Sequence, residues 1–220
     1  MTYEEIIKDL KSQKNQKNIE GMARFGINPK NTLGISIYVL RPMAKKIGKD
    51  HSLALRLWNS KIHEARILAS YIDEVEKVTE AQMEDWVADF DSWDTCDQVC
   101  SGLFDQTAYA YKKAFEWSKR KEEFVKRAGF TLMAALSVHD KKAPDAKMAK
   151  FFPVIIREAG DERNFVRKAV NWALRNIGKR NKNLNRQAIR VARQLERLDN
   201  KTARWIAKDA LRELTRRKFN

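Results

Sequence analysis

Apolar residues recur along the chain at intervals of three and four positions, and no stretch sustains an alternation of apolar and polar residues. The first spacing lines one face of a helix, whereas alternation would indicate a half-buried strand. The sequence therefore predicts an all-α protein. The predicted helices cover residues 2–14, 17–26, 36–48, 51–59, 62–73, 80–90, 92–103, 105–119, 122–138, 145–159, 162–179, 184–198 and 201–217.

Successive helices joined by short polar turns can pack as a compact bundle or as a solenoid of antiparallel pairs. Here helix pairs recur about every 35 to 40 residues, a period typical of HEAT-like repeats, although the letters themselves do not repeat clearly. We therefore expect a single domain over residues 1–220. Its predicted fold is a curved α-α superhelix, a solenoid of HEAT-like antiparallel helix pairs.

Several residues mark where these helices begin, bend or end. Ser92 and Asp161 precede helices and are expected to cap them. Pro42 and Pro153 lie within apolar periodic stretches, so we expect a kink or break at each. Gly178 is expected to mark the point where the helix over 162–179 frays.

Charge is distributed unevenly along the chain, which has 44 basic and 29 acidic side chains and a formal net charge of +15. Residues 1–100 carry 14 basic and 16 acidic side chains, a charge of −2, whereas residues 101–220 carry 30 and 13, a charge of +17. This asymmetry indicates a surface in the second half that binds a polyanion.

The two cysteines, Cys96 and Cys100, lie one helical turn apart on the same face as Val99 and Leu103, which predicts buried free thiols. The three histidines are scattered, so we expect no metal site and no cofactor. No secretory signal or long apolar run is present, which favours a cytoplasmic protein without membrane contact.

An outward-facing tryptophan is the strongest sign of function in the second half. The apolar stripe of the helix over 162–179 consists of Val166, Val170, Ala173 and Ile177. At 100° per residue, Trp172 points almost opposite this stripe. Its neighbours on the outer face are basic, namely Lys168, Arg175 and Lys179. An aromatic ring among cations indicates a nucleic-acid surface, and the alternative is that Trp172 packs under a neighbouring helix.

The helix over 184–198 carries arginines on one side only, at spacings of four, three and four residues. This arginine stripe consists of Arg186, Arg190, Arg193 and Arg197. Charged runs are usually solvated faces, but a one-sided arginine stripe suffers self-repulsion that an anionic backbone relieves. The stripe therefore favours phosphate contact, in the same groove as the basic residues around Trp172.

The segment Ser92–Asp97 combines an aromatic residue with a carboxylate. Trp93 and Asp97 are four residues apart and so share one helix face. The cysteine stripe takes the core, which leaves Asp97 free to point into a groove. The alternative is that Asp94 or Asp97 only complements the helix dipole. Asp94 points roughly 100° away from Trp93, so Asp94→Asn is expected to have almost no effect on activity.

The helix over 122–138 places Val125, Ala128, Leu132 and Leu136 on its predicted core face. Arg127 lies on the other face, followed there by Thr131 and Ala134. Such small side chains would let a partner approach the helix backbone closely.

Four segments together resemble a known family: Gly34–Ser36 with Leu40 and Arg41, His63–Arg66, Ser92–Asp97 and Lys168–Arg175. Over most of its length the chain is similar to the AlkD-type DNA alkylation repair enzymes, HEAT-like-repeat glycosylases that remove alkylated purines. The resemblance implies that Asp97 is the catalytic carboxylate and that Trp93 and Trp172 are aromatic walls beside the damaged nucleotide. It further implies that Arg127 is a basic partner of the site.

The chemistry of such a reaction suits these residues. A purine alkylated at N3 or N7 is a cationic leaving group and needs no general acid, so a carboxylate such as Asp97 need only stabilise the oxocarbenium-like sugar and hold the attacking water. No lysine nucleophile in an obvious pocket, metal site or phosphate-binding glycine loop is evident. We expect a monofunctional hydrolytic glycosylase that acts as a monomer on duplex DNA containing alkylated bases.

Two other functions remain open at this point. A non-catalytic relative would bind distorted or branched DNA through the same basic groove, and only the retained Asp97 separates it from the enzyme. A protein-interaction scaffold is the usual role of helical repeats, but the charge of the second half and the arginine stripe argue against it.

Overall fold

The computed structural model describes residues 1–219, and all regular secondary structure within that range is helical. It divides into two compact units, residues 1–107 (unit 1) and residues 108 onward (unit 2). Unit 1 contains α1 (Tyr3–Ser12), α2 (Gln16–Arg24), α3 (Ile37–Ile47), α4 (His51–Asn59), α5 (His63–Ile72), α6 (Glu80–Ala88) and α7 (Trp93–Gly102). Unit 2 contains α8 (Ala110–Trp117), α9 (Glu123–His139), α10 (Asp145–Ala149), α11 (Phe152–Glu158), α12 (Asn164–Lys179), α13 (Lys182–Glu196) and α14 (Lys201–Leu214).

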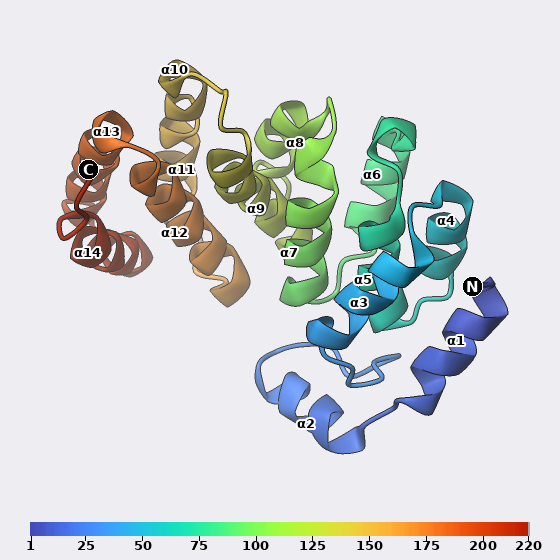
Figure 1. Cartoon of the computed structure of the whole chain (residues 1–220). Coiled ribbons are helices and arrows are strands. Elements are labelled where there is room, and N and C mark those ends of the chain that lie inside the picture. The colour runs from blue at the N-terminus through green and yellow to red at the C-terminus, as the bar shows by residue number, and fades with distance from the viewer. Residues whose placement is uncertain (220) are drawn as a thin grey trace. The chain divides into compact units, whose positions relative to one another are not determined.

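The helices of unit 2 form stacked pairs (Figure 1). Helix α8 packs against α9, α11 against α12, and α13 against α14. The second helix of each pair also contacts the second helix of the next, so α9 packs on α12 and α12 on α14. This is the arrangement of HEAT-like repeats, in which each pair buries its apolar face against its neighbours.

Unit 1 centres on α5, which packs against α3, α4 and α7. Its aromatic core includes Trp58 and Trp86, whose rings stack with centroids 4.0 Å apart. Phe90 meets the Trp58 ring edge-on. These rings fix α4 against α6, because each aromatic side chain buries a large apolar area.

A buried carboxylate holds the loop before α3. Glu64 is fully buried and accepts hydrogen bonds from the backbone N–H groups of Leu33, Gly34 and Ile35, at 2.7–3.1 Å. Gly34 has φ +78°, and a Cβ atom added there would lie 2.4 Å from the carbonyl oxygen of Asn15. The position therefore requires glycine, and the loop is tied to the first turn of α5.

The two internal prolines behave differently. The predicted helix over 145–159 is broken into α10 and α11, and Pro153 occupies the first turn of α11, where its missing N–H group is harmless. By contrast, α3 continues through Pro42. The carbonyl that loses its helical partner there belongs to Tyr38, which is 78 % exposed and can be hydrated instead.

Three other local predictions differ from the structure. Ser92 is the N-cap residue of α7, as expected, but it makes no capping hydrogen bond, because its hydroxyl accepts from the backbone N–H of Asn28. Asp161 lies before the first residue of α12 and accepts from the backbone N–H of Arg163, the residue at the N-cap. Gly178 lies inside α12 and is buried, where a Cβ atom would come within 2.8 Å of Ala188.

The predicted helix over 105–119 is also shorter than expected. A short 3-10 turn covers Phe104–Gln106, and α8 begins only at Ala110. The hydroxyl of Thr107 donates to the carbonyl of Phe104, so a local side-chain bond competes with the helix there. Among residues 1–219, no helix combines the length and the apolar character needed to cross a membrane.

Candidate nucleic-acid interface

Helix α7 presents Trp93 and Asp97 together on its partly exposed face, while Cys96 and Cys100 are completely buried on the other. The indole N–H of Trp93 donates to the carbonyl of Phe25 at 3.0 Å, which anchors the ring to the end of α2. The predicted shared face is therefore present. The aromatic plane and the carboxylate are offered on consecutive turns of one helix.

The predicted buried thiols are confirmed for both cysteines. Burial, together with the neighbouring Cys96, raises the pKa of the Cys100 thiol well above its usual range, so Cys100 remains a neutral core residue. Among residues 1–219, no group of three or more His, Cys, Asp and Glu side chains is placed to hold a metal ion.

Asp94 has a specific partner that its sequence position does not reveal. Its Oδ2 atom lies 2.9 Å from Nε2 of His63, a side chain on α5 that is only 5 % exposed. The other ring nitrogen of His63 lies 3.3 Å from the hydroxyl of Thr95. Burial by itself lowers the pKa of His63, but the hydrogen bond and charge of Asp94 outweigh it and raise the pKa above its ordinary value.

This contact corrects the expectation that Asp94→Asn would be nearly silent. The carboxylate joins the first turns of α5 and α7, immediately beside Trp93. Its second oxygen, Oδ1, is buried without a hydrogen-bond partner in the described part of the chain. A change at Asp94 would therefore disturb the end of α7 that carries Trp93.

On α12, Trp172 lies on the expected side. The apolar stripe opposite it is completely buried at Val166, Val170, Ala173 and Ile177, whereas Trp172 is half-buried. The indole ring is thus on the partly open face of α12, next to the exposed Lys168.

The cationic surroundings of Trp172 are partly neutralised by α14. Arg175 forms ion pairs with Glu213 and, at 3.0 Å, with Asp209, while Lys179 lies 3.2 Å from Glu213. Burial raises the pKa of both carboxyls, but these basic partners and Asn171 outweigh it and lower the pKa of Asp209 and Glu213 overall. Of the three basic neighbours predicted for Trp172, Arg175 and Lys179 are therefore tied to α14.

Arg127 and its neighbours are not on an outer face, contrary to expectation. Arg127 is 5 % exposed, and Thr131 and Ala134 are completely buried. The reason is that α9 packs against both α8 and α12, so side chains opposite the predicted core face are covered as well. The guanidinium of Arg127 donates to the carbonyl of Phe165 at 2.6 Å, which links α9 to α12. Its role as a basic partner of the site remains a prediction.

The arginine stripe is exposed along one side of α13. All four arginines are on the solvent side of that helix, and its apolar side packs against α12 and α14. The stripe therefore points away from α12, and its expected place in one groove with the basic residues around Trp172 stays a prediction. Arg193 is paired with Glu196 at 2.9 Å, and Arg197 is the C-cap residue of α13.

Two kinds of residue were missed by sequence reasoning. The acidic side chains of α14 that pair with α12 could have been suspected from Asp209 and Glu213, which are four residues apart in a basic segment. The partnership of His63 with Asp94 joins positions 31 residues apart and leaves no local signal.

Known proteins provide a further comparison. A family model described as "DNA alkylation repair enzyme" matches residues 6–214. A solved structure described as "A new family of proteins related to the HEAT-like repeat DNA glycosylases with affinity for branched DNA structures" superposes with a TM-score of 0.80 at 17 % sequence identity. The match covers 96 % of this chain and 95 % of that one, which shows the HEAT-like repeat fold. None of the curated proteins matches the sequence. Because the family model spans nearly the whole chain, this protein belongs to the DNA alkylation repair enzyme family.

Proposed function

We propose that the protein is a DNA glycosylase that hydrolyses the N-glycosidic bond of purines alkylated at N3 or N7 in duplex DNA. The observation that carries this proposal is the pairing of Trp93 and Asp97 on one partly exposed face of α7. The bond from Trp93 to the carbonyl of Phe25 holds the ring in place, which gives the site the preorganisation that electrostatic catalysis needs.

In the proposed reaction, the alkylated base leaves as a neutral molecule because it already carries a positive charge. Positive charge then develops on the deoxyribose, where the Asp97 carboxylate and the face of Trp93 stabilise it. Asp97 also orients the water that adds to C1′ of the sugar and accepts its proton. The products are the free base and an abasic site, and the step requires no covalent enzyme intermediate.

Binding of the DNA backbone is assigned to unit 2, which carries 30 basic and 12 acidic side chains, a formal charge of +18. Unit 1, by contrast, has a formal charge of −3. We assign backbone contacts to Lys168 and to the arginine stripe on α13, and a further aromatic contact with the damaged DNA to Trp172. Phosphate contacts of this kind position the protein on its substrate without reading sequence.

Affinity for branched DNA without catalysis is the second candidate function. The specific observation in its favour is that the solved structure with the same fold is described as having affinity for branched DNA. The two functions share the basic surfaces, but only the glycosylase requires a carboxylate beside Trp93.

One experiment separates the two. The purified protein is incubated with methylated duplex DNA, and released 7-methylguanine and 3-methyladenine are quantified by chromatography, while binding to a four-way junction and to an unbranched duplex is measured in parallel. We expect release of methylated bases from the duplex. A preference for the junction with no base released would replace the glycosylase with the branched-DNA-binding function.

A further inference from the structure

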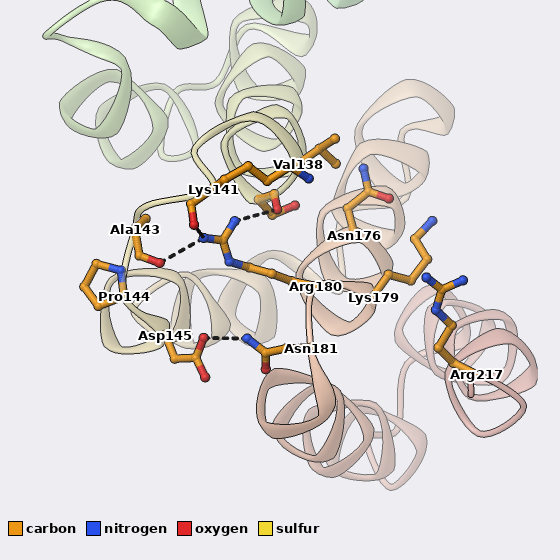
Figure 2. Close-up of a pocket in the computed structure, with 11 residues that line it drawn as sticks. Val138, Lys141, Ala143, Pro144, Asp145, Asn176, Lys179, Arg180, Asn181 and Arg217 are labelled. Carbon is orange, nitrogen blue, oxygen red and sulfur yellow. Dashed lines mark hydrogen bonds between the residues drawn. The ribbon is translucent and has the colours of Figure 1, made fainter. Parts of the chain in front are cut away.

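A polar pocket in unit 2 lies outside the proposed catalytic site. It has a volume of about 540 Å³ and lies where the last turns of α9 and α12 meet the segment after α14 (Figure 2). The side chains of Lys141, Asn176, Lys179 and Arg217 line it around a central Arg180. Such a polar, strongly charged lining suits a small anion better than an apolar ligand.

The charge of this pocket is predominantly positive. Four cations line it against one carboxylate, Asp145. Asp145 is already satisfied by the side-chain amides of Asn181 and Asn183, each at 2.7 Å. Within residues 1–219, Lys141 and Arg217 make no ion pair with a carboxylate, whereas Lys179 is paired with Glu213. An anion in the pocket would relieve the repulsion among these cations.

The wall of the pocket is fixed by Arg180. Its guanidinium donates to the carbonyls of Ser137, Lys141 and Ala143, at 2.9–3.1 Å. These bonds hold the loop between α9 and α10 against the end of α12, as the dashed lines of Figure 2 show. These hydrogen bonds from Arg180, a partly buried residue, hold the backbone of Lys141 in place at the pocket.

Asn176 provides a second, independent observation. The residue is 8 % exposed, and its side chain lines the pocket and makes no hydrogen bond to any described residue. Its amide atoms are reached by solvent from the pocket rather than sealed in the core, so a ligand that accepts a hydrogen bond can take the place of water there. In Figure 2 the amide lies on the same side of Arg180 as the ends of Lys141 and Lys179.

We propose that this pocket binds one phosphate group of the DNA backbone, an inference that rests on the proposed action on DNA. Lysine ammonium groups, an arginine guanidinium and an amide N–H are together the donors that phosphate oxygens accept from. Lys179 follows Trp172 by seven residues on the same face of α12, so the pocket lies about 10 Å further along that helix. The bound phosphate would fix the register of the strand relative to Trp172.

The test compares the salt dependence of duplex binding for Lys141→Gln and Arg217→Gln with that of two matched controls. Lys142→Gln and Lys218→Gln remove the same charge one residue away, at exposed side chains that do not line the pocket. Each pocket variant should flatten the slope of log affinity against log salt by up to about 0.9, the value for one lost phosphate contact. The double variant of Lys141 and Arg217 should not exceed that value, because both side chains hold the same phosphate, whereas the controls should keep the wild-type slope.

A third variant, Asn176→Asp, places a carboxylate inside the pocket and should weaken duplex binding by about tenfold or more. Thermal unfolding of each variant confirms that it is folded. Equal slopes for pocket and control variants would overturn the phosphate site. The slopes are measured on undamaged duplex, so the test of the phosphate site does not depend on base release. A protein that released no methylated base could still show the predicted difference between pocket and control variants.

Discussion

At the scale of single residues, His63 shows how α7, the helix that carries Asp97, is held against α5. The ring is almost completely buried between α5 and α7, and it contacts Asp94 at one nitrogen and Thr95 at the other. A buried histidine next to a partly buried carboxylate is stabilised in its charged form when the attraction within the pair exceeds the cost of burial.

We predict that the pKa of His63 lies above its ordinary value of 6.5 and that Asp94→Asn lowers it, because the effect of burial is then opposed only by the smaller contributions of Glu64 and Asp91. A raised folded-state pKa means that the pair stabilises the fold fully below the unfolded pKa and loses this contribution as pH rises through the folded one. Histidine NMR titration and urea unfolding between pH 6 and 9 measure both effects.

The matched control is Asp91→Asn, which removes a nearby charge that makes no hydrogen bond to His63 and should lower its pKa less. An unchanged His63 pKa in Asp94→Asn, or a stability difference between wild type and that variant that does not depend on pH, would show that the pair is not ionic.

Trp172 provides a second prediction at this scale. Because its ring is half-buried, Trp172→Ala should reduce the free energy of unfolding by less than the roughly 3 to 5 kcal/mol expected for emptying a core aromatic site, while base excision slows. Trp117→Ala, at a completely buried position of the same unit, should lose stability within that range. Denaturant titration of both variants gives the comparison, and equal losses would place Trp172 in the core.

At the scale of elements, the helical spacing correctly identified which side of each helix is apolar, but not what covers the opposite side. Helices α9 and α13 illustrate the difference. The polar side of α13 remains exposed, whereas the side of α9 that carries Arg127 is buried against neighbouring helices. Which helix is central in a stack depends on contacts between residues distant in sequence, and periodicity within one helix does not report them.

The arginine stripe provides the prediction at this scale. Arg186 and Arg190 are exposed and have no carboxylate partner among the described residues. If α13 contacts phosphates, the double variant Arg186→Gln with Arg190→Gln should flatten the slope of log duplex affinity against log salt concentration. The slope should change by about 1.8, twice the value for one phosphate contact. The control is Lys8→Gln with Lys11→Gln on α1, which removes the same charge from unit 1. Equal effects of the two double variants would exclude a local contact at α13.

At the scale of the whole molecule, composition and period were sufficient to predict an all-α protein of HEAT-like pairs, and the fold match over 96 % of the chain confirms this prediction. The charge asymmetry also corresponds to the division into two units. The distribution of cations over surfaces could not be predicted, because the pairing of Arg175 and Lys179 with α14 and the outward direction of the stripe arise from packing.

The most direct test of the central proposal is single-turnover release of methylated bases by wild type and by Asp97→Asn, with protein in excess over methylated duplex. The substitution keeps the shape of the side chain and removes the charge that would stabilise the sugar, so release should slow by roughly 10²- to 10³-fold. Duplex affinity should remain nearly unchanged, because the carboxylate does not attract phosphates. Asp91→Asn, which removes an exposed charge two residues before Trp93, should retain the wild-type rate. Equal release rates for wild type and Asp97→Asn would contradict the account, since the carboxylate would then have no part in breaking the glycosidic bond.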